Sequence, residues 1–246
     1  MIHRLLGLTC AALGTAWAAA EPLNDAATVA RACSVFCSGP LMAAVQTCEP
    51  PLFNDSKTFV DCPLLVDPED ALDAFAALGP APSREALAAF VGGYFGPPGS
   101  DLVSATPPDW TETPPLLQRI SNATWREFAA SLNGIWPELY REVSADVFVA
   151  PQRFSLLRRR HGLVLPGGRF RESYYWDSYW IVRGLVLSGM LDTAQGLVQN
   201  LLDDVLDFGF VPNGGRVRAL SERGPRVTWP RPCAAFHSPC FCPFAA

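Results

Sequence analysis

The sequence is poor in basic residues and in histidine. Its 19 Lys and Arg are outnumbered by 24 Asp and Glu, so the formal net charge of −5 gives no basic surface for nucleic acid. Beyond residue 20 no apolar run is long enough to cross a bilayer, and no stretch alternates polar and apolar residues as a half-buried strand does. These absences disfavour a nucleic-acid-binding protein, a later membrane span and a β-sheet protein.

The N-terminus is typical of a secretory signal peptide over residues 1–20. Arg4 precedes an apolar run from Leu5 to Ala16, and small residues lead to a cleavage point near Ala20. A membrane anchor is the alternative, although the run is short for spanning a bilayer. We therefore expect the chain to enter the secretory pathway and become extracellular.

Four cysteines follow close together: Cys33, Cys37, Cys48 and Cys62. In an oxidising compartment this grouping predicts disulfides, with three pairings open. A zinc site is the alternative, but only His161 and His237 remain beyond the predicted leader to serve as imidazole ligands.

The sequence also contains two N-x-S/T sequons, which begin at Asn54 and Asn122. In a secreted chain each is a candidate glycosylation site. Each is equally compatible with an unmodified surface asparagine.

Helical periodicity recurs along the chain, and the fold class predicted from it is all-α. In the region 21–165, which also holds Pro-rich loops, helices are expected over 26–35, over 68–78, and from a cap at Ser83 to Gly92-Gly93. A further helix is expected over 121–140, stopped or kinked near Pro137. In the region 166–217 an αα-hairpin is expected, with helices over 177–190 and from a capping box at Asp192 to Gly209. The expected inward residues of this hairpin are Ile181, Leu185, Val186, Leu197, Val198, Leu201, Leu202, Val205 and Leu206.

The stretch "PGGRFRESYYWDSYW", residues 166–180, combines a glycine turn, arginines, aromatic rings and carboxylates. Arg169, Tyr174, Trp176 and Asp177 offer the flat faces and paired hydrogen-bonding groups that a sugar site needs. The simpler alternatives are a packed aromatic core, a helix cap at Asp177, and a surface ion pair at Glu172.

This stretch closely resembles the first signature of the trehalases, glycoside hydrolases that split α,α-trehalose into two glucose molecules. "DSKTFVDCPL" (residues 55–64) and "GFVPNGGRV" (residues 209–217) resemble two further segments of that family. The resemblance implies the first helices of an (α/α)6 toroid and trehalose as the substrate. It also implies sugar-binding roles for Arg169, Tyr174, Trp176, Asp177 and Asn213.

The same resemblance implies an inverting acid/base reaction that needs no cofactor or metal. Neither Glu172 nor Asp177 matches the family's acid or base, which belong to stretches like "GWDFSSRW" and "EGFGWTNG" that this sequence does not contain. We therefore expect no catalytic residue in this chain. A truncated, non-catalytic secreted fragment that at most binds sugar is the alternative to an active enzyme.

Residues 218–246 diverge from the family pattern and carry prolines and three further cysteines, Cys233, Cys240 and Cys242. Their lack of periodicity predicts a disordered tail. Prolines also interrupt the pattern of a lipid-anchor signal, so membrane attachment is expected only through an anchor that this chain lacks.

Overall fold

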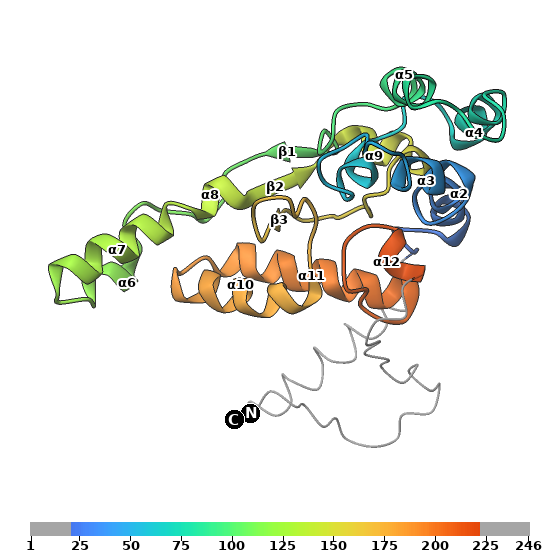
Figure 1. Ribbon diagram of the computed structural model, residues 1–246. Coiled ribbons are helices and arrows are strands. Elements are labelled where there is room, and N and C mark those ends of the chain that lie inside the picture. Colours follow the sequence, from blue (N-terminus) through green and yellow to red (C-terminus); the bar gives the residue numbers. More distant parts are fainter. Residues whose placement is uncertain (1–20, 222–246) are drawn as a thin grey trace, which may run out of the picture.

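The structure is a computed structural model that describes residues 21–221 (Figure 1). It is mostly helical, which confirms the all-α class and fits the first helices of a toroid. The predicted signal peptide and the part of the predicted tail after residue 221 lie outside the described residues. For residues 218–221 the predicted disorder is wrong, because they form a short helix whose Leu220 packs against the larger core. The helices are α2 (Ala26–Phe36), α3 (Pro40–Gln46), η1 (Thr58–Asp61), α4 (Pro68–Ala76), α5 (Arg84–Tyr94), α6 (Pro115–Gln118), α7 (Ala123–Asn133), α8 (Trp136–Leu139), α9 (Ala145–Val149), η2 (Pro151–Arg153), α10 (Tyr175–Leu187), α11 (Leu191–Phe208) and α12 (Arg218–Ser221).

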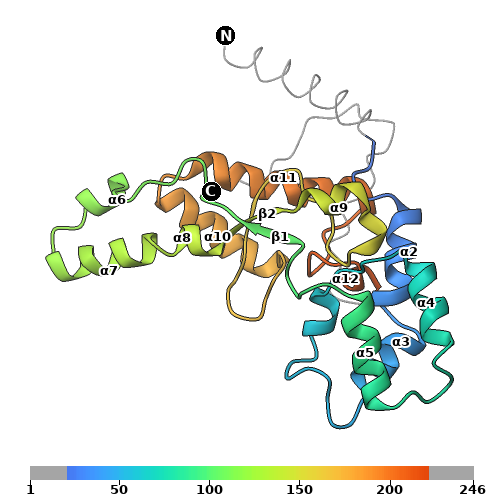
Figure 2. The ribbon, with the colours of Figure 1, turned by 90° about the horizontal axis from the view of Figure 1, so that it is seen from above.

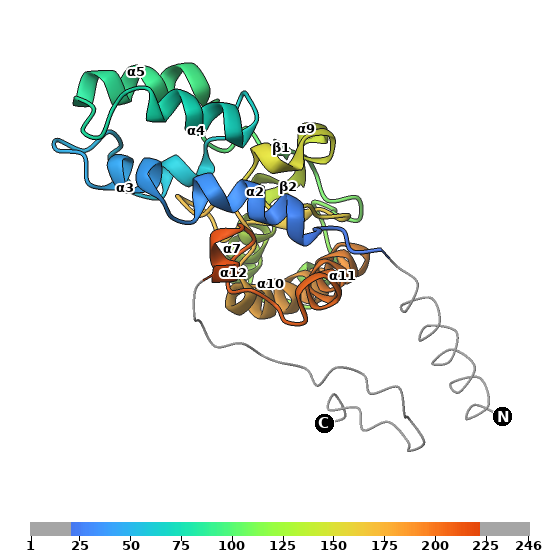
Figure 3. The same ribbon diagram turned by 90° about the vertical axis from the view of Figure 1, so that its right-hand side faces the viewer.

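Helices α2 to α5 enclose the larger hydrophobic core, on one side of the molecule in Figure 3. Phe36 and Phe59 are completely buried at its centre. The predicted cap at Ser83 is confirmed, because its side chain accepts a hydrogen bond from the backbone N–H of Ala86. The predicted end of α5 at Gly92-Gly93 is wrong: the helix continues to Tyr94, whose ring stacks on that of Phe90, so packing overrides the weak helix propensity of glycine.

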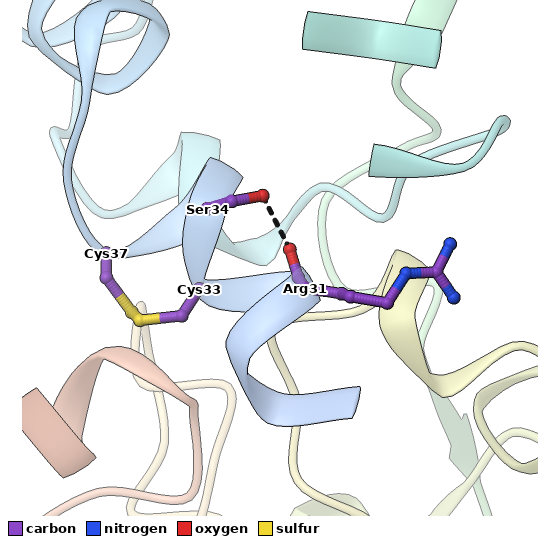
Figure 4. The surroundings of a disulfide bond; sticks show 4 residues. All are labelled: Arg31, Cys33, Ser34 and Cys37. Carbon is purple, nitrogen blue, oxygen red and sulfur yellow. Dashed lines mark hydrogen bonds between the residues drawn. A yellow bond between two sulfur atoms is a disulfide. The ribbon is translucent and has the colours of Figure 1, made fainter. Parts of the chain in front are cut away.

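One disulfide forms within this core region, between Cys33 in the last turn of α2 and Cys37 just after it (Figure 4). The expectation of disulfides is thus confirmed for one pair. Cys48 and Cys62 are free, and burial raises the pKa of the Cys62 thiol to about 11. Within residues 21–221 no group of three or more His, Cys, Asp or Glu side chains could hold a metal ion.

A small antiparallel sheet, which the sequence did not predict, lies between this core and the C-terminal hairpin. Its strands are β1 (Leu102–Ser104), β2 (Tyr140–Val143) and β3 (Leu163–Val164), in that spatial order, with Leu102 opposite Val143 and Tyr140 opposite Val164. Strands of two to four residues are too short to show an alternating pattern. The buried side chains of Tyr140 and Val164 pack on α10 and α11.

The predicted αα-hairpin is confirmed as α10 and α11, and Gly209 ends α11 in the left-handed conformation. The predicted capping box at Asp192 is wrong, because Met190 holds the cap position without a side-chain bond. Asp109 supplies the cap from a distant loop. Its carboxylate accepts the backbone N–H groups of Asp192 and Thr193, at 2.8 and 3.1 Å.

The inward face of α11 is more polar than predicted. Asn200, Asp203 and Asp204 are buried with Leu197, and Asp204 pairs with the buried Arg159. In contrast, Val186, Val198 and Leu206 are exposed, so their predicted inward positions are wrong. The polar side of α11 can face the interior because Arg159 pairs with Asp204 there, and a buried carboxylate needs such a partner.

Helices α6 and α7 form an arm that extends away from the rest of the molecule (Figures 1 and 2), whereas α8 packs on α10 through Trp136. The helix expected over 121–140 is interrupted before the predicted point near Pro137, because α7 ends at Asn133 and α8 begins at Trp136. Asn122 caps α7 through a bond from the Trp125 N–H. Trp125, Phe128 and Leu132 all lie exposed on α7. The arm therefore presents an uncovered apolar face.

Within residues 21–221 no single helix has the length and apolar composition of a membrane span. Helices α2 and α3 reach that length and composition only when taken together, across a bend of 41°.

Candidate functional site

The glycine turn of the signature stretch projects one arginine from the surface. Gly167 and Gly168 have φ angles of 106° and 61°, in the left-handed region that glycine adopts without strain. The Phe170 N–H closes the turn on the Gly167 carbonyl, at 3.3 Å. Arg169 lies within this turn, and its side chain is 59% exposed. The predicted role of the two glycines in a sharp turn is confirmed.

Backbone hydrogen bonds join this stretch to the second segment singled out in the sequence. The Tyr175 N–H donates to the Asn213 carbonyl at 3.1 Å, and the Gly215 N–H donates to the Ser173 carbonyl at 2.9 Å. Tyr174 and Gly214 form an antiparallel bridge between these two bonds. Asn213, which is exposed, is thereby held beside the start of α10.

The residues predicted to hold a sugar thus gather at one end of α10. Trp176 is 71% exposed and Asp177 is half-buried in the first turn of the helix, while Tyr174 is the residue that precedes it. The packed-core alternative is wrong for Trp176 and also for Trp180, which is 53% exposed. The helix-cap alternative for Asp177 is wrong as well, because Tyr174 holds the cap position and no side chain caps the helix.

Glu172 has a different environment from these exposed residues. Its side chain is buried, pairs with Lys57, and accepts a hydrogen bond from the Tyr174 hydroxyl at 2.9 Å. Burial and the adjacent negative charge of Glu172 both raise the pKa of Tyr174. The predicted surface ion pair of Glu172 is therefore a buried one, with a lysine in place of an arginine.

A network of buried charges extends from Glu172 under the site. Asp61 lies 3.2 Å from Lys57 Nζ, 3.2 Å from Arg171 Nη1 and 3.0 Å from Arg216 Nε. Arg216 also pairs with Asp101 at 2.7 Å and donates to the Arg171 carbonyl at 2.9 Å. Three cations here balance three carboxylates, which is the condition for keeping such groups buried.

The turn itself is bound to the same N-terminal segment. Arg169 Nη1 donates to Asp55 Oδ2 at 3.0 Å. The backbone N–H of Lys57 and then the Arg169 guanidinium lower the pKa of Asp55, so the carboxylate is held in its charged form. Arg169 is therefore a predicted site residue that already forms an ion pair within the protein.

Sequence reasoning missed most of this supporting layer, made up of Asp55, Lys57, Asp61, Asp101, Arg171 and Arg216. Asp55, Lys57 and Asp61 belong to "DSKTFVD", and Arg216 to "GGRV", so both segments were identified but not these roles. A usable signal was present. Charged residues next to strongly apolar ones such as Phe59 and Val60 are candidates for buried pairing.

The arrangement is chemically suited to holding a polyhydroxylated ring. Arg169 supplies a fork of donors, Asp177 supplies acceptors, and Trp176 supplies an accessible aromatic face. Glu172 is buried and neutralised by Lys57, which removes it as a free acid or base in this arrangement.

The predicted glycosylation sites both lie on the surface. Asn54 is exposed next to Asp55, and Asn122 is exposed at the start of α7. Modification of either asparagine stays a prediction.

Comparison with known proteins identifies the family of the chain. The sequence model of the family described as Trehalase matches residues 51–223. The chain is 43% identical to human trehalase over 195 residues, which cover 78% of this chain and 33% of that protein. It is 42% identical to trehalase of Apis mellifera over 200 residues (80% of this chain, 32% of that protein) and 44% identical to a probable trehalase of Oryza sativa subsp. japonica over 164 residues (66% and 29%). The chain spans about a third of the length of the curated relatives it matches, and it belongs to the trehalase family.

Proposed function

We propose that this chain carries a sugar-binding part of an enzyme that hydrolyses α,α-trehalose to two glucose molecules. The names of its relatives support trehalose as the substrate. The observation that carries the proposal is the pair of backbone hydrogen bonds between the signature stretch and residues 213–215. These bonds bring Asn213 to the same end of α10 as Trp176 and Asp177.

In this proposal each residue contacts the sugar in its own way. Arg169 and Asn213 donate hydrogen bonds to hydroxyl oxygens, and Asp177 accepts from hydroxyl hydrogens. The Trp176 ring lies against an apolar C–H face of the sugar. Tyr174 contributes its ring, because its hydroxyl hydrogen is already donated to Glu172.

The reaction we propose for the family is inverting, with one carboxylic acid protonating the leaving oxygen and one carboxylate activating water. Neither role falls to Glu172, whose charge is taken up by Lys57, nor to Asp177, which serves the sugar. The proposed acid and base belong to stretches that this sequence does not contain, so the chain binds trehalose without hydrolysing it. No cofactor or metal is needed for this chemistry.

A second proposal is the alternative already named: a truncated, non-catalytic secreted fragment that at most binds sugar. The exposed apolar faces of α7 and α11 favour it, because monomeric proteins rarely leave such faces uncovered. The Cys33–Cys37 disulfide supports an oxidising, secretory compartment.

Titration of the purified chain with trehalose, followed by protein NMR or by tryptophan fluorescence, tests the binding proposal. Signals of Trp176 are expected to shift in a saturable way for the wild type. Asp177→Ala and Arg169→Ala are expected to weaken binding at least tenfold, since each removes a charge-assisted contact. Glu85→Ala, on the exposed start of α5, is the control and should bind as the wild type does. Equal affinity in all four proteins, or no saturation in any, would remove the proposal.

A further inference from the structure

The charged residues of the short segment 55–61 each meet a charged residue of the signature turn. Asp55 pairs with Arg169 at 3.0 Å, Lys57 pairs with Glu172, and Asp61 pairs with Arg171 at 3.2 Å. The partners are more than 100 residues apart in sequence. Three cross-links between two short segments fix their relative position far better than one would.

Segment 55–61 is itself firmly anchored. The Asp55 side chain accepts the backbone N–H of Lys57 at 2.9 Å, which closes a local turn before η1. Phe59 and Val60 are buried in the larger core, and the Val60 carbonyl accepts bonds from Ser155 and Arg216. Segment 55–61 is therefore a fixed support for the residues of the signature turn that pair with it.

Arg169 needs such a base more than its neighbours do. It sits in a turn built on two left-handed glycines, and its long side chain is mostly exposed. A free arginine side chain has many rotamers, and fixing them costs affinity when a ligand binds. The contact with Asp55 uses one of the five guanidinium N–H donors, so four remain for a ligand.

We infer that Asp55 is a positioning residue of the site, which fixes the Arg169 guanidinium before sugar binds, and that Lys57 and Asp61 hold the turn in place below it. The inference rests on the proposed function, because it takes Arg169 to be a sugar ligand. It goes beyond that proposal in assigning a role to the segment "DSKTFVD". Asp55 does not touch the sugar in this assignment and acts only through Arg169.

The opposite role is chemically reasonable, and a single substitution at Asp55 distinguishes it from positioning. If Asp55 competed with sugar hydroxyls for Arg169, removing its charge would tighten sugar binding. If Asp55 positions Arg169, the same change loosens sugar binding. The sign of the effect therefore separates the two roles.

The test compares three variants of the full chain. Asp55→Asn removes the charge at constant shape, and Asp55→Glu retains the charge. Glu69→Gln is the matched control. It removes an exposed carboxylate that pairs with Arg31 and with no residue of the signature turn. Each protein is titrated with trehalose, labelled at arginine with phenylglyoxal, and unfolded thermally.

Asp55→Asn is expected to weaken trehalose binding about three- to tenfold, the cost of ordering one long side chain. Labelling of Arg169, read from its proteolytic peptide, should become several-fold faster, while the unfolding midpoint stays within about 2 °C of the wild type because the pair is exposed. Asp55→Glu should largely restore both readouts, and Glu69→Gln should change neither. A purely structural role would lower the midpoint and leave the labelling rate of the folded chain unchanged.

Unchanged or tighter trehalose binding by Asp55→Asn would overturn the inference while leaving the proposed function intact. Failure of the wild type to bind trehalose would overturn the proposed function and the role of Asp55 in sugar binding together. In that case faster labelling of Arg169 in Asp55→Asn would still identify the ion pair. The two failures are thus distinguishable.

Discussion

Arg216 and Asp101 form an ion pair in the interior of the protein, with Nη1 of the arginine 2.7 Å from Oδ2 of the aspartate. Both side chains are buried, and Arg216 also lies 3.0 Å from Asp61. The pair connects the segment after the Asn213 loop to the loop before β1. It therefore joins parts of the chain that meet beneath the proposed sugar site.

Replacement of Arg216 by methionine is expected to lower the free energy of unfolding by about 3–5 kcal/mol, because the buried Asp101 loses the cation it pairs with and Asp61 loses one of its three. Arg153→Met is the matched control. Arg153 pairs with the half-exposed Asp67, so its loss should cost about 1 kcal/mol or less. Urea unfolding monitored by circular dichroism measures both, and equal losses would contradict the role given to the buried network.

Gly214→Ala is expected to destabilise the chain by about 1–3 kcal/mol. An added Cβ at position 214 would lie 2.8 Å from Glu172 Oε2, and Glu172 cannot move freely because it is held by Lys57 and Tyr174. Gly92→Ala is the control in the opposite direction. Position 92 lies in α5 with open space around it, so alanine should add about 0.5–1 kcal/mol of stability. Thermal unfolding measures both variants. Unfolding midpoints that move in the same direction would contradict the close packing of position 214 against Glu172.

The two free thiols in the described part of the chain are expected to react at different rates. Cys62 is buried with a pKa of about 11, so at pH 8 about one molecule in a thousand carries its thiolate. Cys48 is only half-buried and should be alkylated by iodoacetamide much sooner. Peptide mass spectrometry follows each cysteine separately. Equal rates in the folded chain, with the urea-unfolded chain as reference, would show that Cys62 is not enclosed.

The uncovered aromatic face of α7 should bind a hydrophobic dye and promote association. Trp125→Glu or Phe128→Glu is expected to reduce dye fluorescence and the fraction of oligomer, because each removes a large exposed ring. Ser131→Glu adds the same charge to the same helix without removing a ring, and it should have little effect. Light scattering combined with dye titration is the measurement. A strictly monomeric wild type without dye binding would show that these faces do not associate.

Local sequence pattern was sufficient where local energetics decide the structure. Ser83 caps α5 because cap preference depends on the adjacent backbone, and Gly209 ends α11 because few other residues adopt its conformation. The pattern failed where a distant residue decides. Asp109 displaced the predicted cap at Asp192, and Asp204 turned the polar side of α11 inward to meet Arg159.

The same division applies to the candidate site. The concentration of rings and charges over residues 169–177 could be recognised in the sequence, and so could the separate segment that contains Asn213. Their meeting depends on two backbone hydrogen bonds, from Tyr175 to Asn213 and from Gly215 to Ser173, which have no local sequence signal. The pairing of Glu172 with Lys57 could not be predicted either, since it depends on the tertiary packing of segments 115 residues apart.

Glucose release from trehalose by the purified 246-residue chain is the most direct test of the account. The predicted result is a rate equal to that of a buffer control, measured in the same trehalose concentration range in which the chain binds the sugar. Release well above the control, and abolished by Asp177→Ala, would contradict it. Such a result would place the catalytic carboxylates within this sequence.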